Sequence, residues 1–84
     1  AAMQVWEQLC ESLRQSGFAV RIASGVNWIT GQPAVWLELE ATPCEWLKLD
    51  ISTQTLGYPS DCVRLSVGNS AAEVIAGLRE SAGN

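Results

Sequence analysis

The sequence contains no histidine, and its 84 residues include a single lysine, Lys48. Without histidine the chain cannot form a Ser-His or Cys-His nucleophilic pair, a histidine general base or a histidine-containing metal site. Glu38 and Glu40 share one face of a predicted strand, but acids that alternate with apolar residues are typical of any half-exposed strand. We therefore expect no catalytic residue, no metal site and no cofactor, and we predict that the protein is not an enzyme.

Cysteine is also scarce. Three cysteines, Cys10, Cys44 and Cys62, cannot all pair within one chain, and no two of them have the spacing of a zinc knuckle or a redox pair. Free thiols fit a reducing compartment. We expect these cysteines to act as small apolar side chains.

Positive charge is low, because five basic residues face nine acidic ones and leave a net charge of -4. The basic residues are scattered singly rather than clustered: Arg14, Arg21, Lys48, Arg64 and Arg79. Phosphate backbones are bound by clusters of cations that release counterions. Nucleic acid is therefore disfavoured as a partner.

Long apolar runs are missing. None approaches the roughly 20 residues that span a bilayer, and no basic start leads into an apolar segment as in a signal peptide. These absences predict a cytoplasmic protein without a membrane partner.

The size and composition indicate one ordered domain over residues 1–84, because a second domain would be too small to hold a hydrophobic core. The apolar content of 48% and the charged content of 17% are those of globular proteins. Ala1 and Ala2 precede the first methionine, as an addition to the natural chain or as part of a longer one, and are left out of the fold argument.

Helical periodicity marks both ends of the chain. Residues 3–16 carry apolar side chains at helical spacing, and Gly17 is a candidate left-handed cap. Ser70 and Glu73 form a capping box before a second apolar stripe, which predicts a helix to about Ala82.

Between these helices, period-two alternation predicts strands at 18–24, 35–40, 46–51 and 62–67, with a further extended segment at 26–30. We expect a bulge or reversal at Ser24 and Gly25, because the buried positions change from even to odd there. Residues 53–61 are rich in turn formers and are predicted to be the longest loop. The residues expected to face the core are Phe18, Val20, Ile22, Ile29, Val35, Leu37, Leu39, Leu47, Leu49, Ile51, Val63, Leu65 and Val67.

Two amphipathic helices and a sheet with one apolar face predict an α+β fold. We expect a two-layer sandwich in which the N- and C-terminal helices pack on one face of a four- or five-stranded, mostly antiparallel sheet, in the order α-β-β-β-β-α. The opposite sheet face is left uncovered by helices.

Two hairpin registers follow from the pattern. Facing residues of antiparallel strands share a face, and a short loop after residue 40 places Glu38 opposite Lys48 and Leu37 opposite Leu49. If residues 31–33 form a three-residue hairpin loop, Trp28 lies opposite Trp36.

Tryptophan on the polar side of these strands is the feature with some specificity. Trp6 belongs to the first helix stripe and is expected in the core, whereas Trp28, Trp36 and Trp46 are predicted on the outer sheet face. Either the chain itself covers these rings, through the 53–61 loop or the stems of its basic side chains, or they form an apolar patch with a charged rim, as interface hot spots do. The candidate binding residues are Trp28, Trp36, Trp46, Arg21, Glu38, Lys48, Arg64 and Tyr58.

These observations favour a non-catalytic protein-binding module that uses an exposed, tryptophan-bearing sheet face. Its partner would be another protein, a second copy of the chain in a homodimer, or both. Such a small acidic protein would serve as an adaptor, inhibitor or immunity-type protein, including one encoded by a phage or mobile element. The alternative is a small-molecule-binding domain with its site between the sheet and the 53–61 loop.

Overall fold

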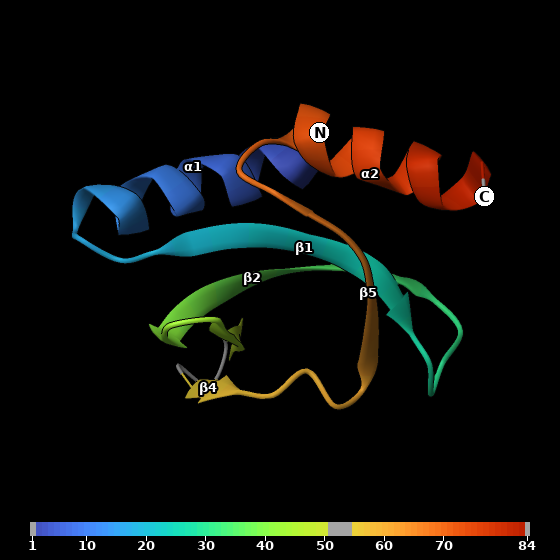
Figure 1. Ribbon diagram of the computed structural model, residues 1–84, viewed down its shortest axis with the longest axis horizontal. Coiled ribbons are helices and arrows are strands. Elements are labelled where there is room, and N and C mark those ends of the chain that lie inside the picture. Colours follow the sequence, from blue (N-terminus) through green and yellow to red (C-terminus); the bar gives the residue numbers. More distant parts are fainter. Residues whose placement is uncertain (1, 51–54, 84) are drawn as a thin grey trace.

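The computed structural model describes residues 2–50 and 55–83. Within them, one helix precedes and one helix follows the five strands of a single antiparallel sheet (Figure 1). The elements are α1 (Ala2–Gln15), β1 (Val20–Asn27), β2 (Pro33–Thr42), β3 (Glu45–Asp50), β4 (Thr55–Gly57), β5 (Cys62–Gly68) and α2 (Ala71–Gly83). The predicted α+β sandwich is confirmed. It has five strands, because the segment predicted as the 53–61 loop contains the short strand β4.

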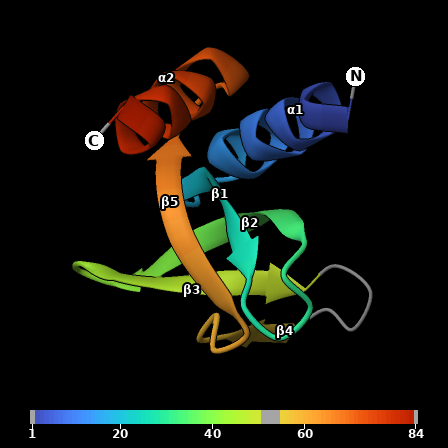
Figure 2. The same ribbon diagram turned by 90° about the vertical axis from the view of Figure 1, so that its right-hand side faces the viewer.

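Both helices contact β1 and lie on the same side of the sheet (Figures 1 and 2). The main core lies between these two layers, and its buried members come from α1, β1, β2 and α2. They are Cys10, Val20, Ile22, Leu37, Leu39 and Val74. Trp6 is partly buried against this cluster, as its place in the helix stripe predicts.

The predicted helix ends are confirmed. Gly17 has a φ of 97° and follows α1, and the Phe18 amide donates to the Leu13 carbonyl at 3.1 Å in a Schellman ending. Phe18 itself is exposed and precedes β1, so its predicted place in the core is wrong. At the start of α2, the Ser70 hydroxyl accepts a hydrogen bond from the Glu73 amide at 3.3 Å.

The predicted register between β2 and β3 is confirmed. Leu37 pairs with Leu49 and Glu38 with Lys48, whereas the inward position predicted for Ile51 lies outside the described residues. The predicted register between the preceding pair of strands is wrong, because Trp36 lies opposite Ala23.

The turn between β1 and β2 is longer than predicted. The Asn27 side-chain oxygen accepts hydrogen bonds from the Ile29 and Thr30 amides, at 3.0 and 3.1 Å. This capping holds residues 28–30 in a turn rather than in a strand. The prediction of a separate strand with an inward Ile29 is therefore wrong, and both Trp28 and Ile29 are exposed.

Strand β5 departs from the predicted alternation because it carries a bulge. Ser24 pairs with Ser66 while Gly25 pairs with Arg64, which leaves Leu65 without a partner in β1. As a result Ser66 is buried, whereas the predicted inward residues Leu65 and Val67 are exposed. The bulge was expected at the correct point of β1, but the extra residue belongs to β5.

The sheet order is β4-β3-β2-β1-β5, so β5 is an edge strand. In a flat sheet β5 and β3 would lie roughly 14 Å apart. Instead, Nη2 of Arg64 on β5 lies 3.3 Å from the Trp46 carbonyl oxygen on β3. The sheet is therefore strongly curved, so that the Arg64 side chain on β5 reaches across the sheet face to β3.

Candidate functional site

A buried carboxylate occupies the concave face of the curved sheet. Glu38 on β2 is 0% exposed. One of its oxygens accepts from Nε of Arg21 at 3.0 Å and lies 2.9 Å from Nη2 of the same arginine. The other accepts from Nε of Arg64 at 2.6 Å and from the Trp36 indole at 2.9 Å. Both oxygens are thus hydrogen-bonded, as a buried charge requires.

The tryptophans of this face are covered by the chain itself. Trp36 is only 2% exposed, with the Lys48 ammonium 5.7 Å from its ring centroid. Trp46 is partly buried, and the Arg21 guanidinium lies 4.1 Å from its ring centroid. The prediction of an exposed Trp36 is therefore wrong, because the Lys48 side chain lies over its ring and its indole donates to the buried Glu38.

Lys48 forms an ion pair with a different residue from the predicted Glu38. Although it lies opposite Glu38 in the register, its ammonium is 3.6 Å from the Asp61 carboxylate and 3.9 Å from the Cys62 sulfur. The backbone amide of Asp61 donates a hydrogen bond to the carboxylate of the same residue. This bond, together with the Lys48 charge, lowers the pKa of Asp61. This ion pair links β3 to the start of β5.

Six of the eight predicted binding residues thus meet in one internal network: Arg21, Trp36, Glu38, Trp46, Lys48 and Arg64. The other two lie outside it. Tyr58 is exposed and donates to Glu45 at 3.1 Å, which raises the pKa of the phenol. Trp28 is also exposed, and its indole donates to the Ser60 carbonyl at 2.7 Å.

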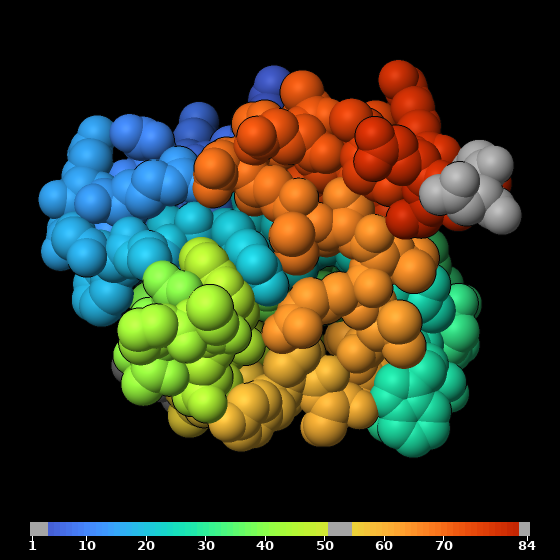
Figure 3. Space-filling model, in the orientation of Figure 1, coloured from blue at the N-terminus to red at the C-terminus, as the bar shows by residue number. Residues whose placement is uncertain are grey.

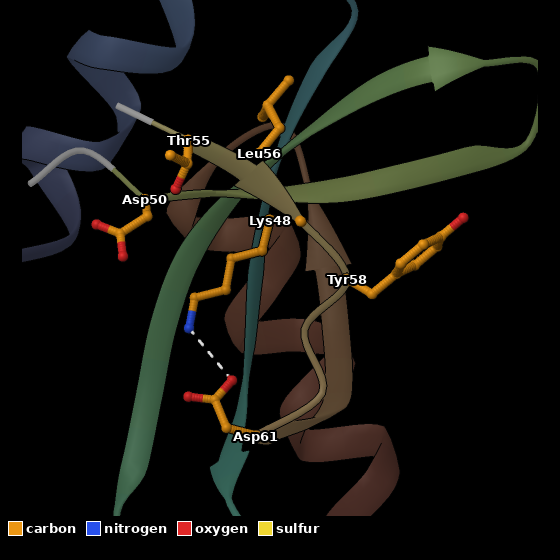
Figure 4. Close-up of a pocket in the computed structure, with 7 residues that line it drawn as sticks. Lys48, Asp50, Thr55, Leu56, Tyr58 and Asp61 are labelled. Atoms are coloured by element: carbon orange, nitrogen blue, oxygen red, sulfur yellow. Dashed lines mark ion pairs between the residues drawn. The ribbon is translucent and has the colours of Figure 1, made fainter. Parts of the chain in front are cut away.

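A small pocket lies where the sequence predicts the alternative ligand site. Its volume is about 220 Å³, and its walls come from β3, β4 and the segment before β5. Figure 4 shows Lys48 reaching toward Asp61 across this pocket, whereas the Tyr58 ring points away from both. Among the described lining residues no aromatic ring points inward to stack on a ligand.

The described residues hold no group of three or more metal-ligating side chains. Glu40, predicted on the same strand face as Glu38, accepts a hydrogen bond from the Cys44 amide at 2.9 Å and so stabilises the turn between β2 and β3. No described helix is long and apolar enough to cross a membrane.

Two segments that carry four exposed large apolar side chains meet where β1 ends and β5 begins. Trp28 and Ile29 in the turn are 62% and 66% exposed, and Val63 and Leu65 on β5 are 50% and 45% exposed. We call these four residues the Trp28 surface. The Trp28 amide donates to the Asp61 carbonyl at 3.1 Å, which fastens the turn to the start of β5. Figure 3 shows the two segments in contact at the lower right.

Sequence reasoning assigned three of these four residues to the core, because it assumed regular alternation through the turn and along β5. Two features of the sequence could have predicted that these residues are exposed. One is the side-chain oxygen of Asn27, which favours a capped turn, and the other is Gly25. At Gly25 a Cβ atom would overlap the Val63 carbonyl oxygen, so the two strands approach closely there.

The three cysteines differ in burial, which leads to an ordered reactivity. We expect iodoacetamide to modify the exposed Cys44 first and Cys62 more slowly, with Cys10 reacting only after unfolding. Burial raises the pKa of both Cys10 and Cys62 and so lowers their thiolate fractions. Mass spectrometry of peptides against labelling time checks this order, and a native Cys10 that reacts as fast as Cys44 would contradict it.

Comparison with known proteins assigns no family, because no family model, curated protein or solved structure matches this chain. The site must therefore be interpreted from its own geometry.

Proposed function

We propose that the protein is a non-catalytic protein-binding module that docks through the Trp28 surface. The observation that supports this is the exposure of four large apolar side chains, one of them tryptophan, at one end of the molecule. Exposed apolar patches mark interaction sites, and tryptophan is enriched among the residues that carry binding energy.

The surface is also held in place before any partner arrives. The Trp28 indole and main-chain amide are tied to Ser60 and Asp61, and the Asn27 side chain caps the turn that carries Ile29. A preorganised surface loses little conformational entropy on binding. These ties favour a binding role over a turn that is merely exposed.

The partner is another protein chain, and the module acts as an adaptor, inhibitor or immunity-type protein in the cytoplasm. Trp36 and Trp46 contribute indirectly, because they belong to the network that holds β5 across the sheet. The partner would therefore bind the Trp28 surface and not the outer sheet face.

Polar substitution of the surface tests this proposal. We expect the double variant Trp28→Ser, Ile29→Ser to remain folded, because both side chains are exposed, and to lose a partner that the wild-type chain captures from its host. A loss of at least about 2 kcal/mol in binding is typical of such anchors. Affinity capture with mass spectrometry, followed by calorimetry on the purified partner, measures it.

The matched control is Tyr58→Ser, which removes an exposed aromatic outside the Trp28 surface. It should leave the captured partner unchanged. The proposal fails if the double variant captures the same proteins as the wild-type chain. Concentration-dependent association of the wild-type chain that the double variant lacks would identify the partner as a second copy.

A second candidate is binding of a small polar molecule in the pocket beside Lys48. The observation in its favour is the position of that pocket, between β3 and the segment that precedes β5. Its volume of about 220 Å³ is below the roughly 300 to 1,000 Å³ of most ligand pockets. We therefore place this candidate second.

A further inference from the structure

A larger hollow lies between the edge strand β5 and helix α2. Its volume is about 430 Å³, within the roughly 300 to 1,000 Å³ range of ligand sites. Figure 2 shows β5 running up to α2, so the hollow adjoins the part of the edge strand near the helix. Its walls include Arg21, Arg64, Leu65, Val67, Glu80 and Ser81.

The arginine wall carries unused positive charge. Arg21 and Arg64 share the single carboxylate of Glu38, which leaves a net charge of +1 on the three side chains. A guanidinium has five N–H donors. The hydrogen bonds and ion pairs of each arginine with described residues use only Nε and Nη2, and the Arg21 guanidinium also stacks over the Trp46 ring. Among the described residues Nη1 of each has no acceptor, and Glu80 on the opposite wall forms no ion pair with either. Both arginine side chains remain partly exposed.

The shape of the hollow favours an extended chain. β5 has no strand on its outer side in the described sheet, and an extended segment can lie beside such an edge. The bulge at Leu65 interrupts regular pairing, and the Leu65 carbonyl accepts from the Ser81 hydroxyl at 3.1 Å. These features hinder continuous ladder pairing with β5 by any chain, including a second copy, so an extended segment there would be held mainly by its side chains. A short segment of a different protein, fixed by a charged side chain, fits better.

We propose that this hollow binds an acidic side chain on an extended segment of the partner protein, with its carboxylate on Arg21 and Arg64. Planar carboxylates match the guanidinium fork, and such hydrogen bonds are the strong ones. The inference rests on the proposed function, because Leu65 belongs both to the Trp28 surface and to the hollow. One partner segment would therefore cross both.

The probe is a short acetylated and amidated peptide of alternating valine and threonine with one central glutamate, and its control carries glutamine instead. We expect the glutamate peptide to shift the amide resonances of Arg64 to Val67 and the arginine Nε–H signals in an NMR titration. The glutamine peptide should bind about tenfold to a hundredfold more weakly, the size of a hydrogen bond to a charged group.

A variant of the opposite wall tests the charge without disturbing the Glu38 network. Glu80→Gln removes a negative charge from the hollow and should tighten binding of the glutamate peptide about two- to fivefold, as for one exposed charge pair. Glu11→Gln on α1 makes the same change in net charge outside the lining of the hollow. It should leave the affinity unchanged.

Equal binding of the two peptides, or no gain in Glu80→Gln, overturns the inference. If inorganic phosphate or free glutamate binds as tightly as the peptide, the hollow is a site for free anions. The proposal of an extended partner segment is then wrong. A Trp28 variant that loses the partner while the two peptides bind alike refutes only this inference. Selective peptide binding with no effect of the Trp28 variant on capture refutes only the proposed function.

Discussion

Replacement of Glu38 by glutamine should lower the free energy of unfolding by about 3 to 5 kcal/mol, the usual cost of breaking a buried ion pair. The variant keeps the size of the side chain but removes its charge. Arg21 and Arg64 would then share no carboxylate, and the amide NH₂ group would face the N–H donors of Arg21 in one orientation or those of Arg64 and Trp36 in the other. A small domain has about 5 to 15 kcal/mol of stability in all.

Equilibrium urea unfolding, followed by tryptophan fluorescence, measures the loss. The matched control is Glu11→Gln, because the contacts of Glu11 among the described residues are exposed ones, with Arg14 and Gln15, each at 3.5 Å. Exposed pairs contribute about 1 kcal/mol or less, so this variant should unfold close to the wild-type midpoint. A loss below about 1 kcal/mol in Glu38→Gln would mean that the two arginines do not depend on the carboxylate.

The features that the sequence predicted correctly are those with local causes. The Schellman ending at Gly17 and the cap at Ser70 depend on residues within one helical turn. The register of β2 and β3 depends on a short loop and on the alternation of Leu37 and Leu39 with charged residues. Each signal lies within a few residues of the structure it specifies.

The candidate site depends instead on the curvature of the whole sheet, which no short stretch encodes. Glu38 and Arg64 are 26 residues apart and lie on strands that are not neighbours. Residue patterns placed both on the outer sheet face but gave no sign that β5 would fold across it. The burial of Trp36 opposite the small Ala23 follows from the same curvature.

This network also connects stability to the proposed binding surfaces. Arg64 joins β5 to Glu38 on β2 and to the Trp46 carbonyl on β3. The same strand presents Val63 and Leu65 to solvent. A change that releases β5 from the sheet would therefore displace the Trp28 surface and the hollow beside α2 together.

Replacement of Gly25 by alanine should release β5 in this way and lower the free energy of unfolding by about 3 kcal/mol, the upper end of overpacking costs. A Cβ atom at this position would overlap the Val63 carbonyl oxygen. Because the obstruction is backbone rather than a flexible side chain, β1 and β5 would have to separate at the point where their register shifts.

Urea unfolding measures the loss in Gly25→Ala, and NMR of the arginine Nε–H groups reports whether Arg64 still reaches Glu38. The matched control is Gly57→Ala on β4, where an added Cβ atom meets no described atom within 4 Å. This control should stay within about 0.5 kcal/mol of the wild-type chain, as surface substitutions do. Equal stability of the two alanine variants would contradict the close approach of β1 and β5, and with it the placement of Arg64 over the concave face.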